Sequence, residues 1–115
     1  MNHRIPVLLD GDPGHDDAIA WMLAATSLDI RGVSSAAGNQ TIEKTTRNAL
    51  RICTLLGIRA PVAVGLARPL LSEALTAPSV HGVSGLDGPA LPEPDREAAP
   101  ESAPEQMARL LRESA

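Results

Sequence analysis

Three short apolar runs alternate with two helical segments over the first half of the chain, and this alternation constrains the fold more than any other feature. The runs at 5–9, 29–37 and 61–65 carry the β-branched residues typical of buried strands. The segments between them, 16–26 and 41–57, have helical composition or spacing. A β-α-β-α-β order predicts an α/β fold with a parallel sheet and right-handed crossovers.

The segment at 41–57 is the most clearly marked helix. Thr41 is suited to the N-cap position and Gly57 to the C-terminal stop. Because Trp21 is the only Phe, Tyr or Trp residue in the chain, the core is expected to be aliphatic, with Trp21 inside it. One face of this helix is apolar and is expected to pack on the sheet: Ile42, Ala49, Leu50, Ile52, Cys53 and Leu56.

The regular pattern stops after residue 71. Residues 72–100 are rich in Gly and Pro and show at most a short helical turn near their start. So long a connection is typical of a functional loop or of a disordered segment. A last helix is predicted at 102–114, where Ser102 and Glu105 fit a capping box. Its apolar stripe consists of Met107, Leu110 and Leu111.

A crossover helix in a parallel sheet normally leads into another strand, and no residues for one follow here. We therefore expect residues 1–115 to be the N-terminal β-α-β-α-β-α part of one longer α/β domain, with its C-terminal remainder absent. The region 72–100 is then a long loop at the active site.

Charge and composition exclude several classes of protein. The net charge is −4 and the chain has no basic cluster, which argues against a nucleic-acid partner. No apolar run is long enough for a signal peptide or a membrane span, so no membrane partner is expected. The single cysteine, Cys53, excludes a disulfide framework and favours a reducing compartment such as the cytoplasm.

Four aspartates lie within eight positions after the first predicted strand: Asp10, Asp12, Asp16 and Asp17. Open α/β sheets bind ligands beyond the carboxyl ends of their strands, which is where these residues fall. Helix capping accounts for one or two of them, with Asp16 as the cap and Asp17 beside the helix dipole. Four carboxylates folded toward one point would repel one another, and a hard divalent cation removes that repulsion. The pattern therefore predicts a calcium or magnesium site and does not separate the two metals.

A second chemistry fits part of this pattern. Haloacid-dehalogenase-type phosphotransferases also place D-x-D after a first strand, with the first Asp as nucleophile and magnesium as cofactor. Two observations weigh against that alternative. Such enzymes usually have Thr or Val soon after the second Asp, whereas Pro13 and Gly14 follow here, and the pair Asp16 and Asp17 would have no role.

The stretch "LLDGDPGHDDAIA" resembles the signature of the inosine–uridine nucleoside hydrolase family, D-x-D-P-G-x-D-D-A. Three further stretches resemble family segments in the same order. They are "SSAAGNQTIEKTTRNAL" (34–50), "PVAVGLARPL" (61–70) and "VHGVSGLDGPALPEP" (80–94). The residues in these stretches are most similar to those of bacterial pyrimidine-specific ribonucleoside hydrolases.

The resemblance implies a Rossmann-like parallel sheet and hydrolysis of the N-glycosidic bond of ribonucleosides, with cytidine and uridine preferred. It also implies a Ca²⁺ cofactor, calcium-activated water as nucleophile, a ribonucleoside partner and a homo-oligomeric, tetrameric parent enzyme. The alternative is a non-catalytic, truncated remnant of such an enzyme. The 115 residues alone are expected to be inactive, since further ligands would come from later strands.

The resemblance also assigns roles to the aspartates. Asp12 matches a calcium ligand that is also the proposed general base. Asp17 matches a second calcium ligand and Asp10 a supporting residue near the metal. Asp16 matches a carboxylate that hydrogen-bonds the ribose hydroxyls.

Two polar residues outside the first turn complete the predicted site. Asn39 matches a ribose-contacting asparagine, and His81 matches a catalytic histidine near the leaving base. From the residues alone, Asn39 fits equally well in a left-handed turn, and His81 could be an ordinary loop histidine. No role is expected for His15, and Asp87 is expected to stabilise its own loop.

Overall fold

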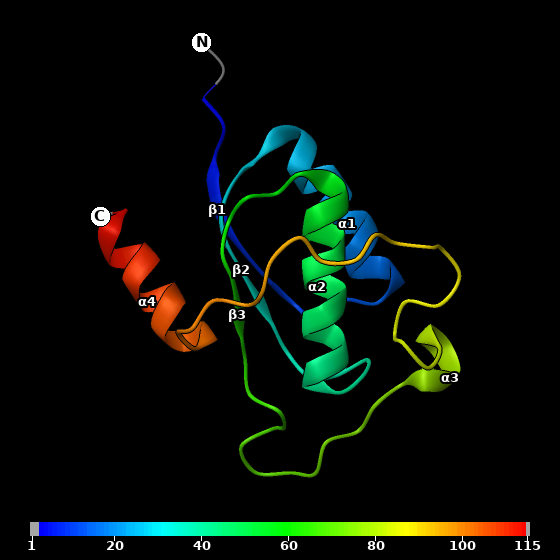
Figure 1. Cartoon of the computed structure of the whole chain (residues 1–115). Helices are drawn as coiled ribbons and strands as arrows, with labels where there is room; N and C mark the ends of the chain where they lie inside the picture. The colour runs from blue at the N-terminus through cyan, green and yellow to red at the C-terminus, as the bar shows by residue number, and fades with distance from the viewer. Residues whose placement is uncertain (1–2, 115) are drawn as a thin grey trace.

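The computed structural model describes residues 3–114 and contains a three-stranded parallel sheet in the order β1-β2-β3 (Figure 1). The strands are β1 (Pro6–Gly11), β2 (Asp29–Ser35) and β3 (Val62–Val64). The α/β class and all three strands confirm the prediction from the alternating pattern. Strand β1 extends two residues further than predicted, so it carries Asp10 inside the sheet.

Helices cover both faces of this sheet. The helices α1 (His15–Ser27) and α2 (Ile42–Leu56) lie on one face, and α4 (Ala103–Glu113) lies on the other (Figure 1). Two neighbouring residues of β2, Gly32 and Val33, face opposite sides of the sheet. Val33 belongs to the core beside α2, whereas a Cβ added at Gly32 would meet the side chains of α4. The predicted long loop contains only one short helix, α3 (Pro78–His81).

Local signals fix the helix ends largely as predicted. Gly57 closes α2 in the left-handed conformation, with φ of 68°, and Ser102 and Glu105 form the expected capping box. Thr41 holds the N-cap position of α2, but its side chain makes no capping hydrogen bond. None of the helices within residues 3–114 is long and apolar enough to cross a membrane.

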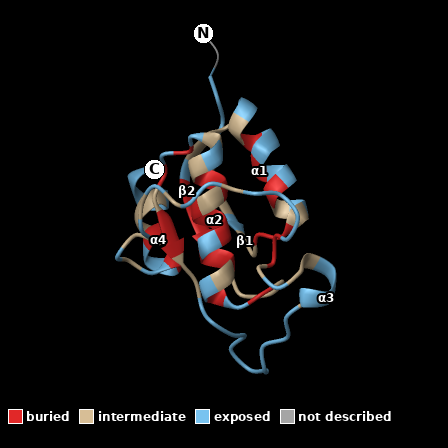
Figure 2. Cartoon of the chain, turned by 45° about the vertical axis from the view of Figure 1, so that its right-hand side comes forward, coloured by how far each residue is buried: buried red, intermediate tan, exposed pale blue. Residues whose placement is uncertain are grey.

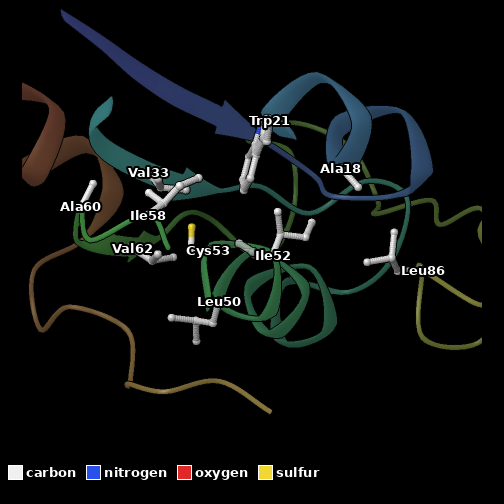
Figure 3. Packing of buried hydrophobic residues seen from close by; sticks show 11 residues of the cluster. Ala18, Trp21, Val33, Leu50, Ile52, Cys53, Ile58, Ala60, Val62 and Leu86 are labelled. Carbon is white, nitrogen blue, oxygen red and sulfur yellow. The ribbon is translucent and has the colours of Figure 1, made fainter. Parts of the chain in front are cut away.

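The core lies between the sheet and the α1–α2 layer (Figure 3). Trp21 is 3% exposed and packs in the same cluster as Val33, Ile52 and Val62. Cys53 is fully buried there, and burial raises the pKa of its thiol to about 11. The predicted core positions of Trp21 and Cys53 are confirmed, and the thiol is kept in its unreactive, protonated form.

The apolar stripe predicted for α4 is only partly covered. Met107 and Leu110 are half-buried, and Leu111 is exposed. The side chains that α4 does bury are Ala103 and Gln106, and the Gln106 amide donates to backbone carbonyls of the sheet. Figure 2 shows that buried residues lie in β2, in β3 and on the inner sides of the helices, whereas β1 has none and the outer sides of the helices are exposed.

The two edges of the sheet differ. Beside β3, the Ala99 N–H donates to the Val62 carbonyl at 2.7 Å, and Ser102 pairs with Val64. Strand β1 pairs only with β2 within residues 3–114. All three strands are parallel, so their carboxyl ends lie at the same edge of the sheet. Open parallel sheets bind ligands beyond the carboxyl ends of their strands, and β1 ends at this edge.

Candidate functional site

The turn after β1 places the carboxylates at this carboxyl end. Asp12 follows the last residue of the strand, and Pro13 behind it is fully buried. Helix α1 begins at His15 with Gly14 in the N-cap position. The proposal that Asp16 caps the helix is therefore wrong, because Asp16 lies inside the first turn.

Asp12 is the centre of a hydrogen-bond network between two loops. Its carboxylate Oδ2 accepts the backbone N–H of Asn39 at 2.8 Å, and its backbone carbonyl accepts the Asn39 side-chain amide at 2.8 Å. Its own backbone N–H donates to Oδ2 of Asp17 at 3.0 Å. No residue other than glycine has a positive φ in the described chain, so a left-handed turn at Asn39 is excluded.

The surroundings of Asp17 destabilise the ionised form of its carboxyl group. Its carboxyl pKa is raised, first because burial removes water from the charged form and then because the charges of Asp16 and Asp12 lie nearby. The hydrogen bond from the Asp12 backbone opposes this shift. A cation beside Asp12 and Asp17 would relieve the repulsion.

The other two aspartates make no hydrogen bond to Asp12 or Asp17 within the described residues. Oδ1 of Asp10 accepts a 2.6 Å hydrogen bond from the Ser34 hydroxyl, and the Asp16 side chain is exposed. Within residues 3–114, no three His, Cys, Asp or Glu side chains gather closely enough to hold a metal ion. The expected convergence of four carboxylates is thus not seen: a hydrogen bond joins Asp12 to Asp17, and Asp16 lies near Asp17 without one.

Two glycines make room for these two carboxylates. A Cβ at Gly11 would lie 2.6 Å from Oδ2 of Asp17, and a Cβ at Gly38 would overlap Oδ2 of Asp12. Carboxylate oxygens are the ligands that calcium prefers, and their mutual repulsion also suits a cation. The chemical type of these two side chains therefore suits a calcium ion. Because calcium takes about six to eight oxygens, the described residues supply only part of a coordination shell.

His81 is brought to the same place from the long loop. Its ring stacks on His15, with centroids 5.4 Å apart and planes inclined by 21°. A Cβ at Gly14 would lie 2.5 Å from Nδ1 of His81 and 2.8 Å from Nδ2 of Asn39. The first turn, the β2–α2 turn and the His81 loop therefore meet around Gly14.

Side chains of α2 and of the preceding turn hold the His81 loop in place. The Asn48 amide donates to the carbonyls of Pro13 at 3.2 Å and Ser84 at 2.8 Å, so it ties the loop to the first turn. The Gln40 amide donates to the Val83 carbonyl at 3.0 Å. These roles were not predicted from sequence. The signal that could have revealed Asn48 is a polar residue on the apolar, buried face of a helix.

Asp87 stabilises its own loop, as expected. Its carboxylate accepts the backbone N–H groups of Val83 and Ser84 and the Ser84 hydroxyl. These hydrogen bonds, led by that of the Ser84 side chain, lower the pKa of the carboxyl. Asp87 is thus held in its charged form by the turn that it closes.

Three hollows lie near these elements. The one of about 550 Å³ between α2 and residues 93–98 is away from the carboxylates and is bordered by the Arg47–Glu93 ion pair. A second, of about 360 Å³, lies at the carboxyl ends of the strands and is lined by Asp10, Ser35 and Gly65. A smaller hollow of about 230 Å³ is lined by Gly38 and by residues 72–75, so it also borders the site.

The chain is similar to known proteins over nearly all of its length. The family model described as "Inosine-uridine preferring nucleoside hydrolase" matches residues 7–115. The pyrimidine-specific ribonucleoside hydrolase RihA of Escherichia coli K12 is 57% identical over 114 residues, which cover 96% of this chain and 37% of that protein. RihA of Shigella flexneri serotype 5b has the same identity and coverage. The chain thus spans about 37% of the length of these curated relatives.

Solved structures of similar fold give the same picture. A purine-preferring ribonucleoside hydrolase from Gardnerella vaginalis superposes with a TM-score of 0.85 at 29% identity, over 93% of this chain and 36% of that one. An inosine-guanosine nucleoside hydrolase superposes with a TM-score of 0.88 over 98% of this chain and 36% of that one. Its identity is 24%, so it supports the fold alone.

Proposed function

Because the chain belongs to the inosine-uridine preferring nucleoside hydrolase family, we propose that it forms the N-terminal part of an enzyme that hydrolyses the N-glycosidic bond of ribonucleosides. The observation that carries this proposal is the network centred on Asp12. It links the end of β1 to Asn39 and Asp17, and the His81 loop lies beside it. The products would be ribose and the free base.

Pyrimidine ribonucleosides, uridine and cytidine, are the proposed substrates. The support is the 57% identity to proteins named for pyrimidine specificity. The structural matches named for purine or inosine–guanosine substrates share only 29% and 24% identity with this chain. Sequence similarity therefore favours the pyrimidine assignment.

Asp12 is the proposed general base for the attacking water. One carboxylate oxygen, Oδ2, is engaged by Asn39, whereas Oδ1 has no hydrogen-bond partner within the described chain. That free oxygen is the one that would take the proton. The bond from Asn39 orients the carboxylate, so the base is positioned before substrate arrives.

Asp16 and Asn39 are the proposed ribose contacts, and His81 is the proposed contact to the leaving base. Cleavage of an N-glycosidic bond builds positive charge on the ribose ring in the transition state. Carboxylates held beside the ring stabilise that charge. The exposed position of Asp16 leaves its oxygens open to ribose hydroxyls.

Asp12 and Asp17 are the residues proposed to hold calcium, with Asp10 in support. Bound calcium would supply Lewis acidity that makes water a better nucleophile and would lower the cost of bringing the two carboxylates together. The phosphotransferase alternative is not retained, because the family match over residues 7–115 includes the D-x-D stretch itself.

The cellular setting is also a proposal. A buried, protonated Cys53 thiol and the similarity to bacterial hydrolases support a reducing, cytoplasmic location. The homo-oligomeric state that the resemblance implies stays a prediction.

A chimaera tests the proposed function. This chain would replace the matching 37% of the E. coli relative, and release of ribose would be measured from uridine, cytidine and inosine with calcium present. We expect the chimaera to hydrolyse uridine and cytidine, and to do so faster than inosine. Faster turnover of inosine would overturn the pyrimidine assignment. A folded chimaera without hydrolase activity would support the alternative of a non-catalytic remnant.

A further inference from the structure

His15 makes two contacts to the ring of His81, and both involve the same ring nitrogen. The Nδ1 atoms of the two histidines lie 3.2 Å apart, and the backbone N–H of His15 donates to Nδ1 of His81 at 3.4 Å. The two rings are also stacked. Nδ1 of His81 thus lies against the first turn of α1, where it either accepts the backbone N–H of His15 or, when it carries the proton, donates to the bare Nδ1 of His15. Nε2 has no hydrogen-bond partner within residues 3–114.

His15 also contacts the far end of the His81 loop. Its Nε2 lies 2.7 Å from the Asp87 carbonyl oxygen, and the Asp87 N–H donates to the His81 carbonyl at 3.1 Å. Because a carbonyl oxygen only accepts hydrogen bonds, His15 Nε2 is the donor in this contact. His15 therefore touches both residues that close the turn, and its ring is fixed from both sides.

We propose that His15 is the positioning residue for His81, holding Nδ1 of His81 against α1 so that Nε2 is the nitrogen available to the nucleobase of the substrate. This inference rests on the proposed function for the identity of the ligand. The geometry that carries it is the contact of the His15 ring with Nδ1 of His81, the stacking of the two rings and the anchor on Asp87. His15 acts on the substrate only through His81.

The body of the loop is held without His15. Asn48 donates to the Ser84 carbonyl, Gln40 donates to the Val83 carbonyl, and Leu86 is 5% exposed in the core cluster. Loss of the His15 side chain removes the Nδ1–Nδ1 contact and leaves only the 3.4 Å contact from the backbone N–H, so the His81 ring should become less well fixed while the loop stays docked. A purely structural role for His15 would instead loosen the whole loop.

The test uses the 115-residue chain with ¹⁵N-labelled histidine, since only His3, His15 and His81 contribute signals. Long-range ¹H–¹⁵N spectra near about pH 8.5, where ordinary imidazoles are neutral, report the ring nitrogens. His15→Phe keeps a stacking ring without its nitrogens, and His15→Asn restores a polar atom near the Nδ1 position. The exposed His3 gives the signal of a free ring, and His3→Gln is the matched control.

In the wild type, the His81 ring nitrogens should resonate away from the positions of His3, with cross-ring contacts to His15. In His15→Phe they should move toward the positions of His3, because only the backbone N–H contact to Nδ1 remains, and His15→Asn should move them back at least halfway. Amide exchange at Ser84 and Gly85 should stay within about twofold of wild type in both variants. Asn48→Ala should instead speed that exchange roughly five- to tenfold, since one anchoring hydrogen bond is lost.

An unchanged His81 spectrum in His15→Phe would overturn the proposal. So would a tenfold rise in loop amide exchange in that variant, or loss of the fold in both His15 variants by Trp21 fluorescence, because His15 would then be a structural anchor. None of these readouts depends on turnover. Failure of the hydrolase proposal would therefore leave the ring measurement intact and separately decided.

Discussion

Asn39 reaches Asp12 twice, once from its backbone N–H to the carboxylate and once from its side-chain amide to the backbone carbonyl, each at 2.8 Å. The two residues come from different βα turns, 27 positions apart. This pair fixes both the orientation of the Asp12 carboxylate and the distance between the two loops.

Gly38 should be required for the position of Asp12. In Gly38→Ala the new Cβ would overlap Oδ2 of Asp12 and push the carboxylate away from Asn39. Because small misplacements of a catalytic group are costly, hydrolysis of uridine by the chimaera should fall roughly a hundredfold. Gly57→Ala is the control. It meets no atom within 4 Å but has a φ of 68°, so it should lower stability by about 1–2 kcal/mol and leave activity unchanged.

Asp17→Asn should stabilise the calcium-free chain at neutral pH. The pKa of Asp17 is raised above 3.8 by burial and by its neighbours Asp16 and Asp12. The folded state therefore holds this proton more tightly than the unfolded state. The stability that this provides is complete below pH 3.8 and is lost as the pH rises through the folded pKa.

At pH 7 the ionised Asp17 thus opposes folding, and the asparagine removes that charge while keeping an oxygen for the Asp12 N–H. Thermal unfolding without calcium should show a higher Tm for Asp17→Asn. Added calcium should raise the Tm of the wild type and have less effect on the variant. Asp29→Asn, which removes an exposed charge paired with Arg31, is the control. A lower Tm for Asp17→Asn without calcium would contradict the electrostatic argument.

The core beneath the site should be sensitive to substitution on one face of α2 only. Ile52 is 1% exposed and lies in the core cluster, so Ile52→Ala should cost about 2–5 kcal/mol. Leu55 is 48% exposed on the same helix, and Leu55→Ala should cost less than about 1 kcal/mol. Urea unfolding followed by Trp21 fluorescence measures both. Equal losses would show that the helix is not packed as described.

Residues 1–115 alone should bind calcium weakly and should not hydrolyse uridine. The described chain brings two carboxylates together, and a calcium ion takes about six to eight oxygens. It also exposes the edge of β1, which favours association between copies. Calorimetry with calcium and an assay of uridine on protein free of host hydrolase are the measurements. Turnover that follows the purified chain and is lost in Asp12→Asn would show this prediction to be wrong.

The sequence predicts the sheet well because its signals are local. The strand and helix periodicities, the Gly57 stop and the Ser102–Glu105 capping box each act within a few residues, and all appear in the structure. The position of Asp12 also follows from local order, since it directly succeeds β1. These features need no knowledge of the contacts between distant segments.

The arrangement of the site was harder to predict because its contacts are distant in sequence. His15 meets His81 across 66 positions, and Asn48 meets Ser84 across 36. The four aspartates close together in sequence suggested that all four carboxylates meet at one metal site, yet the Asp10 carboxylate accepts a hydrogen bond from the Ser34 hydroxyl instead. Likewise, Gln106 rather than the apolar stripe is buried under α4, because its amide satisfies carbonyls of the sheet. No periodic pattern contains this information.

The most direct test of the account is uridine hydrolysis by the chimaera with and without Asp12→Asn. Asparagine keeps an oxygen for the Asn39 N–H but cannot take a proton from water, and general-base catalysis is worth about a hundredfold or more. We expect an active wild-type chimaera, a loss of at least about a hundredfold in kcat for Asp12→Asn in a chimaera that is still folded, and full activity in Asp29→Asn. Activity of Asp12→Asn within a few-fold of wild type would contradict this expectation.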